Sequence, residues 1–260
     1  MRTRAVVLAI GITAVGLRAL TAAQEERRWS PNGKRYAVSE AGQETGNGQE
    51  RQRLVIYTDA GVLTTVAHVW LVEPDGARRA GIRGCEAWGW VDESRIFCEG
   101  SINPSTGVYL VFDAETGAEL HELFGGHFVW SPDRSHLASL GNVPHFSAVE
   151  EKTDSLEIEG KRVYPAENDR RHHWFRSDLV WSANSRRVAV VDYRTEDRTL
   201  WLVVASAGRV ILLRKLPWML PRGDRPPERT VVLRWEGQRV IIGYGRRRQM
   251  VGVPASVNGQ

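Results

Sequence analysis

Two segments of the sequence combine tryptophan with arginine, and one of them also with histidine, in a way that suits the recognition of a partner. The segment RRHHWFRSD holds His172, Trp174 and Arg176, and the segment KLPWMLPRGDRPPE holds Trp218 and Arg222. Aromatic and arginine side chains dominate many binding surfaces, and loops on a rigid scaffold often carry them. We therefore predict that these five residues lie in loops and bind a partner. The alternative is that the two loops fold back over the scaffold as a lid or plug.

Residues for nucleophilic or acid–base catalysis show no established pattern. The sequence has no G-x-S-x-G segment, which exposes a nucleophilic serine, and no glycine-rich phosphate loop. Glycosidases need only two carboxylates, which different repeats can supply, and Asp113 and Asp192 are the first pair to consider. The main prediction is a protein without catalysis. The alternative is a glycosidase or lyase that uses carboxylates or histidines at a central channel.

Seven histidines raise the question of a bound metal. The densest pair is His172 and His173, but neighbouring residues of a strand point to opposite faces and make a poor pair of ligands. No H-E-x-x-H segment accompanies them. We predict no metal and no cofactor, and we expect the histidines to lie at the surface or in loops.

The two cysteines, Cys85 and Cys98, flank the turn that follows Trp90. In an exported protein, two cysteines at this spacing across a hairpin predict a disulfide. A register that pairs Trp90 with Ile96 places Cys98 opposite Trp88, which argues for the alternative of two buried thiols.

The amino end has the order of a secretory signal peptide. Arg2 and Arg4 precede the apolar stretch from Ala5 to Leu17, and small residues follow up to Ala23. A transmembrane helix needs about 20 apolar residues, more than this stretch contains. We expect cleavage near Ala23 of a signal peptide over residues 1–23, and a periplasmic or secreted mature protein. An uncleaved anchor is the alternative.

The charge of the mature chain is nearly balanced. The leader contains three arginines and no acidic residue, so its removal lowers the formal net charge from +4 to +1. Such a surface does not predict nucleic-acid binding. We expect the partner to be a protein or a cell-envelope component, and we expect no stable membrane span after cleavage.

A repeated pattern organises the chain from Trp29 onward. Each copy has a strand that ends in Trp, then a polar turn, then a second apolar strand, which is typical of a β-hairpin. The copies are WSPNGKRYAV, WVDESRIFC, WSPDRSHLAS, WSANSRRVAVV and WEGQRVIIG. A second hairpin follows several of them and begins at Val69, Val108 and Leu200, which predicts four antiparallel strands in each repeat.

The turns WSPNGK and WSPDRS and the segment LVFDAETG resemble the repeats of TolB-like and WD-repeat β-propeller proteins. This resemblance implies four-stranded blades around a channel and a surface that binds proteins or small ligands, but it implies no active site. We predict an all-β fold in which residues 24–260 form a single β-propeller of about five blades. The alternative is a four-bladed or open arrangement. Closure of the ring would pair the first strand with the sheet that begins TVVLRWEGQRVIIGYG.

Overall fold

The computed structural model describes residues 27–45, 49–68, 87–103, 106–141, 154–219 and 230–255. In these ranges every regular element is a β-strand, and the strand pairs are antiparallel. The all-β prediction is confirmed. No helix in the described ranges is long and apolar enough to cross a membrane. The proposed signal peptide, residues 1–23, lies outside these ranges.

The first sheet has four strands in the order of the sequence. They are β1 (Arg28–Trp29), β2 (Arg35–Thr45), β3 (Gln49–Thr58) and β4 (Gly61–His68). The sequence pattern instead predicts that the outer strands begin at Val69, a segment outside the described residues. That prediction is wrong for this sheet, because β3 and β4 already complete it.

The second and third sheets share one long strand. The second sheet contains β5 (Ala87–Trp90), β6 (Arg95–Asn103), β7 (Thr106–Asp113) and the first part of β8 (Glu119–Trp130). The last part of β8 continues into the third sheet with β9 (Leu137–Leu140), β10 (Leu156–Ile158) and β11 (Lys161–Tyr164). Between its two parts β8 changes direction, where Gly125 and His127 have φ angles of 147° and 53°.

The fourth and fifth sheets complete the described chain. In the fourth sheet, β12 (His173–Phe175) and β13 (Val180–Trp181) both pair with β14 (Val188–Arg194), followed by β15 (Thr199–Ser206) and β16 (Arg209–Met219). The fifth sheet has three described strands, β17 (Val231–Glu236), β18 (Arg239–Tyr244) and β19 (Arg247–Gly252). All five predicted tryptophan hairpins are present.

The polar turns after the tryptophans share one set of hydrogen bonds. In WSPNGK, the hydroxyl of Ser30 accepts the N–H of Arg35, and Asn32 Oδ1 accepts the N–H of Lys34. Ser131 with Asp133 and Ser182 with Asn184 repeat the arrangement in the third and fourth sheets. In each turn the next residue has a positive φ angle; these residues are Gly33, Arg134 and Ser185. The repeated sequence therefore encodes a repeated turn.

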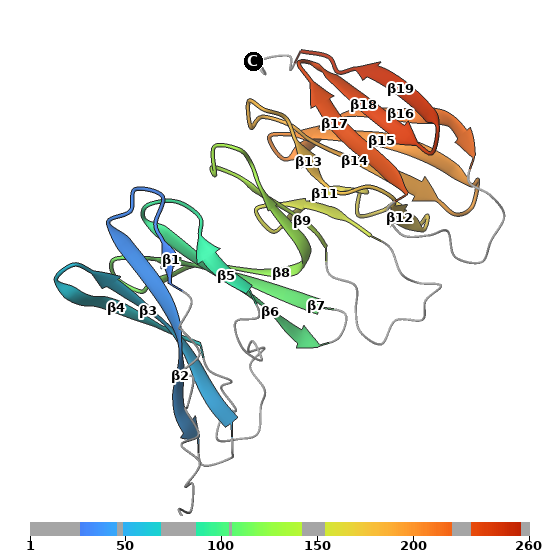
Figure 1. Cartoon of the computed structure of the whole chain (residues 1–260). Coiled ribbons are helices and arrows are strands. Elements are labelled where there is room, and N and C mark those ends of the chain that lie inside the picture. The colour runs from blue at the N-terminus through green and yellow to red at the C-terminus, as the bar shows by residue number, and fades with distance from the viewer. Residues whose placement is uncertain are drawn as a thin grey trace, which may run out of the picture.

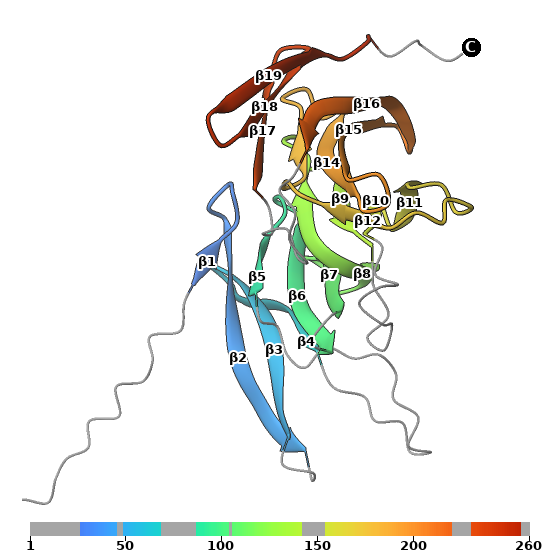
Figure 2. The same ribbon diagram turned by 90° about the vertical axis from the view of Figure 1, so that its right-hand side faces the viewer.

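Four hydrophobic cores join the five sheets face to face. The core between the first and second sheets contains Ile56 and Ile96, and the core between the fourth and fifth contains Leu202 and Val240. The cores around Tyr109 and around Val190 join the remaining neighbours. Figures 1 and 2 show the resulting row, with the first sheet (blue) and the fifth sheet (red) at its two ends.

The tryptophans also link neighbouring sheets by hydrogen bonds. The indole Nε1 of Trp90 donates to the carbonyl of Arg28, that of Trp181 to Val129, and that of Trp235 to Val180. In each case the acceptor immediately precedes the tryptophan of the previous sheet. Trp130 departs from this rule, because its indole donates to the Tyr109 hydroxyl at 2.8 Å. At three of the four junctions, the motif thus defines how a sheet packs on the one before it.

The outer faces of the first and fifth sheets have no core between them in the described residues. Trp29 is 52% exposed and Val232 is 68% exposed, whereas Trp181, at the same motif position as Trp29, is only 9% exposed. The described structure is therefore an open row of five sheets. The number of blades and the closure of a ring stay predictions.

Candidate functional site

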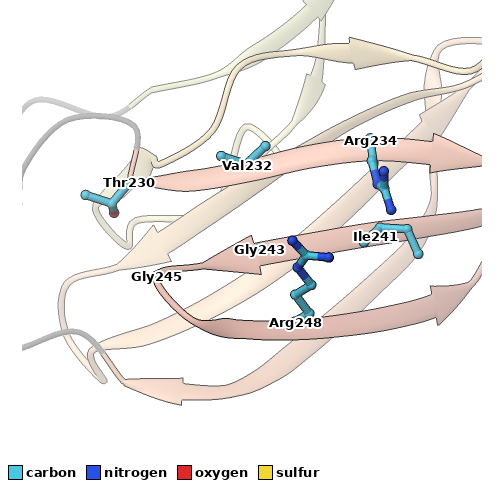
Figure 3. Close-up of a pocket in the computed structure, with 7 residues that line it drawn as sticks. All are labelled: Thr230, Val232, Arg234, Ile241, Gly243, Gly245 and Arg248. Carbon is cyan, nitrogen blue, oxygen red and sulfur yellow. The ribbon is translucent and has the colours of Figure 1, made fainter.

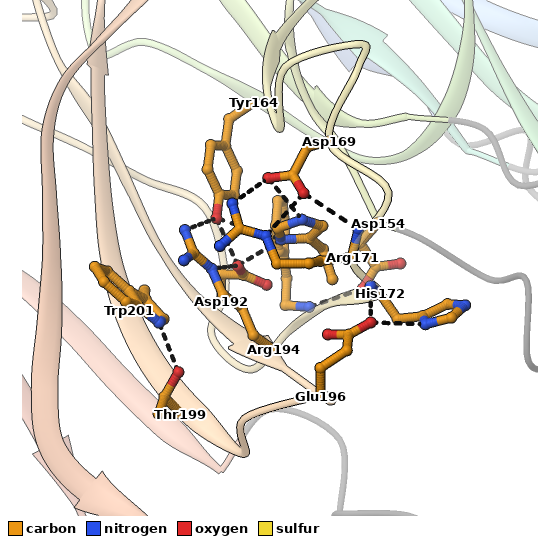
Figure 4. A network of polar contacts seen from close by, with 12 residues as sticks. Asp154, Tyr164, Asp169, Arg171, His172, Asp192, Arg194, Glu196, Thr199 and Trp201 are labelled. Carbon is orange, nitrogen blue, oxygen red and sulfur yellow. Dashed lines mark hydrogen bonds and ion pairs between the residues drawn. The ribbon is translucent and has the colours of Figure 1, made fainter.

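Five ionisable or hydroxyl-bearing side chains meet at one end of the fourth sheet, and we call this group the polar cluster. Its members are Tyr164 on β11, Asp169 in the following loop, His173 on β12, and Asp192 and Arg194 on β14. Figure 4 shows the cluster and its surroundings. Because β12 and β14 are paired with His173 opposite Arg194, the strand register brings most of these side chains together.

Asp192 is the centre of the polar cluster. Its Oδ2 atom accepts the Tyr164 hydroxyl at 2.7 Å and lies 2.7 Å from His173 Nδ1. The Arg194 guanidinium approaches from the other side, with Nε 3.7 Å from the same oxygen and Nη2 3.2 Å from the Tyr164 hydroxyl. Asp169 faces the other ring nitrogen of His173, since its Oδ2 lies 3.4 Å from Nε2. The imidazole therefore stands between two carboxylates.

The cluster is enclosed by protein. His173 and Asp192 are fully buried, and Arg194 is 3% exposed. Burial, followed by the nearby charge of Asp192, raises the pKa of the Tyr164 hydroxyl well above its usual range, so it remains a hydrogen-bond donor. Buried charges of this kind are stable only when they are paired. Because His173 and Asp192 are enclosed and bonded to groups from two sheets, the arrangement holds the strand ends and the neighbouring loop in place.

The loop of residues 165–172 covers the cluster and presents charged groups to solvent. Arg171 donates two hydrogen bonds to Asp169, from Nε to Oδ1 at 2.8 Å and from Nη2 to Oδ2 at 2.6 Å. His172 points the other way and bonds Glu196 Oε1 through its backbone N–H at 2.7 Å and its ring Nδ1 at 2.9 Å. Partial burial alone would raise the pKa of Glu196, but the bonds from His172 outweigh it and lower that pKa.

Replacing Asp169 with asparagine is expected to reduce the free energy of unfolding at neutral pH by about 1 kcal/mol, because half-exposed Arg171 is partly screened by water. The hydrogen bonds from Arg171 hold the pKa of Asp169 below its ordinary range. The stabilisation is thus complete above the unfolded-state pKa of about 3.9 and is lost as the pH falls through the lower folded-state value.

Wild type should consequently lose more stability than Asp169→Asn when urea unfolding is compared at neutral pH and at about pH 3. Glu167→Gln, which removes an exposed carboxylate of the same loop, serves as the control. Identical acid sensitivity of the wild type and Asp169→Asn would contradict the assigned role.

Three of the predicted binding residues lie next to the cluster, in different environments. His172 is half-buried at the edge of the loop. Trp174 lies on β12 and not in a loop, so the predicted loop position is wrong for it. The Arg176 guanidinium is 5.3 Å from the centre of the Trp174 ring and 5.5 Å from that of Tyr193. Arg176 is only 1% exposed. Its side chain is therefore part of the packing between the fourth and fifth sheets, not of an exposed loop.

Trp218 also differs from the prediction. It lies on β16 and not in a loop, is 7% exposed, and stacks on Tyr244 with ring centres 6.3 Å apart. It belongs to the core between the fourth and fifth sheets. The expectation of a loop position is wrong, because Trp218 packs between two sheets. Arg222 lies outside the described residues.

Cys98 lies on β6, is fully buried and is disulfide-bonded. The only other cysteine in the sequence is Cys85, which lies outside the described residues. The expected register is confirmed, since Trp90 pairs with Ile96 and Trp88 pairs with Cys98.

The two carboxylates considered for glycoside hydrolysis do not form a pair. Asp113 Oδ1 accepts the N–H groups of Glu115 and Thr116 in its own turn, and these bonds lower its pKa. Asp192 is enclosed in the polar cluster of the fourth sheet. In the described residues, no group of three or more His, Cys, Asp or Glu side chains has the arrangement of a metal site.

No protein-family model matches the sequence, and no curated protein matches it. Solved structures give distant matches. A prolyl endopeptidase structure has 14% identity and a TM-score of 0.40, over 89% of this chain and 35% of that chain. The β-propeller domain of the trilobed protease from Pyrococcus furiosus has 12% identity and a TM-score of 0.35, over 86% of this chain and 79% of that chain.

A third match is hydrazine synthase from Kuenenia stuttgartiensis, with 10% identity and a TM-score of 0.36, over 87% of this chain and 70% of that chain. This chain spans about a third of the prolyl endopeptidase chain. Similarity at this level assigns neither a family nor an activity. The described chain is an all-β protein built from repeated antiparallel sheets.

Proposed function

We propose that the protein is an exported, non-catalytic binding module of five propeller-like blades that recognises a protein or cell-envelope component. The observation that carries this proposal is the enclosure of the polar cluster. His173 and Asp192 are fully buried and pair with each other, so the groups best suited to acid–base chemistry stabilise the fold. A scaffold that holds a charged loop in place is suited to recognition.

The proposed binding surface is the loop of residues 165–172 with the turn that contains Glu196. It exposes Arg170 and Arg171 to solvent, and His172 stands beside them. The bonds from Arg171 to Asp169 and from His172 to Glu196 fix both ends of this surface. Because the loop is ordered before a partner arrives, binding costs less conformational entropy than the ordering of a flexible segment would.

Export rests on the amino-terminal sequence. Mass measurement of the protein recovered from the periplasm or the medium tests it: a chain that starts after Ala23 supports the proposal, and a chain that still begins at Met1 contradicts it.

The binding proposal is tested with a photoreactive amino acid at Arg170 in the full chain expressed in its native cell, followed by mass spectrometry of the captured species. Arg186, exposed in the turn after Trp181 of the same fourth sheet, provides the control position. We expect one reproducible partner from position 170 and none from position 186. A further His172→Ala change should lower the yield at position 170 while the melting temperature stays nearly constant. Equal capture at both positions, or no capture by a folded protein, would overturn the proposed surface.

A further inference from the structure

Most neighbouring sheets inside the row are joined by a tryptophan of one sheet and a carbonyl group of the other. In the described residues, one end of the row has an unused tryptophan position, and the other end has the matching carbonyl position. At three of the four junctions within the row, the tryptophan of one sheet donates to the preceding sheet, which supplies the carbonyl group of the residue before its own tryptophan. At the start of the row, Trp29 occupies the donor position and is half-exposed. At the end of the row, the corresponding acceptor is the carbonyl of Arg234, which precedes Trp235.

The outer face of the fifth sheet has the shape and chemistry to receive such a ring. A hollow of about 320 Å³ lies on this face and is lined by Val232, Arg234, Ile241, Gly243 and Arg248, among others (Figure 3). Gly243 on β18 pairs with Val232 on β17 and with Arg248 on β19. Because glycine has no side chain, the face is open between Val232 and Arg248. Val232 and Met250, both on this face, are exposed apolar residues.

The outer face of the first sheet is aromatic at the end that holds Trp29. The rings of Trp29 and Tyr36 have centres 5.1 Å apart, and Tyr36 stacks on Tyr57 at 5.0 Å. Arg27 lies over the Tyr36 ring at 5.0 Å, so this face already binds a guanidinium group. These aromatic rings of the first sheet are therefore a suitable surface for the arginines of the fifth sheet.

Two of the four internal junctions show the same combination of groups. Arg28 of the first sheet lies 4.4 Å from the ring centre of Trp88 of the second sheet, and Arg95 of the second sheet lies 5.1 Å from the ring centre of Trp130 of the third. In both, an arginine of one sheet covers a tryptophan of the next. Arg234 and Arg248 of the fifth sheet and Trp29 of the first sheet would repeat this contact.

We infer that the outer face of the fifth sheet binds the outer face of the first sheet of a second copy of this chain. The four packed cores join the five sheets, and the end sheets lie apart in the structure (Figure 1). Each end face therefore finds its complement on another molecule. The contact is head-to-tail, because each copy uses its first sheet for one neighbour and its fifth sheet for the other. Association therefore yields either a closed ring of copies or an open linear assembly.

The test uses two variants of the full chain, each of which blocks one face. Val232→Glu places a charge on the fifth sheet, and Trp29→Glu removes the ring from the first. We expect the wild type to self-associate in light scattering and sedimentation, and each variant alone to raise the Kd of association by about a hundredfold. An equimolar mixture of the two variants should form a dimer, because one intact junction remains possible between them. Leu213→Glu changes an exposed apolar residue of β16, away from both end faces, and should associate like the wild type.

Three results would overturn the inference. The first is a wild-type protein that is monomeric. If the Val232→Glu variant then melts at a lower temperature than the wild type, the first and fifth sheets meet within one chain. The second is association that persists in either single variant. The third is a mixture of the variants that remains monomeric. None of these results depends on the partner-binding loop, so this inference and the proposed function can fail separately.

Discussion

Replacing Asp192 with alanine is expected to lower the free energy of unfolding by about 3–5 kcal/mol, the usual cost of removing one partner from a buried ion pair. The substitution would leave His173 and Arg194 buried beside a cavity and would deprive the Tyr164 hydroxyl of its acceptor at 2.7 Å. A loss of this size is a large part of the total stability of an ordinary domain.

Urea unfolding followed by tryptophan fluorescence measures this loss as a lower transition midpoint. Asp59→Ala removes an exposed carboxylate from the turn between β3 and β4 and should change the midpoint little. Asp192→Asn keeps the shape of the side chain and one acceptor oxygen. Its unfolding midpoint should therefore lie between those of Asp192→Ala and the wild type. A wild-type midpoint in Asp192→Ala would show that the cluster contributes nothing to folding.

Replacing Trp181 with alanine is expected to cost about 3–5 kcal/mol, as for other large buried aromatic residues. Trp181 is 9% exposed in the core between the third and fourth sheets, and its indole donates to Val129 at 2.8 Å. Trp181→Phe retains most of the ring but leaves the buried carbonyl without its donor, so about 1–3 kcal/mol should be lost.

Trp29→Ala is the matched control, because Trp29 has the same motif position but is half-exposed. At concentrations where the protein is monomeric, this change should cost less than about 1 kcal/mol. Calorimetry or urea unfolding of the three variants provides the comparison. Equal losses for Trp181→Ala and Trp29→Ala would mean that the open end of the row is covered within the chain.

The hairpins could be predicted from the sequence because their information is local. A tryptophan, a Ser-x-Asn or Ser-x-Asp turn and an apolar strand determine one another over about ten residues, and side-chain alternation defines the register. The pairing of Trp90 with Ile96 followed directly. The sequence pattern misplaces the outer strands of the first sheet because the segments QERQRLVIYT and GVLTTVAH lack the pattern of the other outer hairpins.

The sequence predicts a loop at Trp218 because Pro217 precedes it. Proline is tolerated at the edge of a sheet, where its missing N–H leaves no ladder bond unmade. β16 is such an edge strand, and its register against β15 shifts between Lys215 and Met219. The sequence signal of a proline was correct, but it marks an irregular edge strand and not a loop.

The polar cluster shows both what local reasoning can provide and where it ends. Alternation along a strand predicts that His172 and His173 diverge, and they do: one bonds Glu196 near the surface and the other is buried against Asp192. The expectation that the histidines are surface or loop residues fails for His173. Tyr164 and Asp192 meet only because β11 of the third sheet lies beside the fourth sheet, and no spacing in the sequence encodes that contact.

The strand shared by the second and third sheets has a consequence for any attempt to divide the chain. Residues at the start of β8 bond β7, and residues at its end bond β9. Strand β8 joins the second and third sheets into one continuous sheet of seven strands, β5 to β11. A cut before β5 or after β11 leaves whole sheets on both fragments, whereas a cut within β8 leaves the second and third sheets incomplete. A split version that reassembles from two pieces must therefore keep β5 to β11 on a single fragment, and under mechanical load these two sheets should give way as one unit.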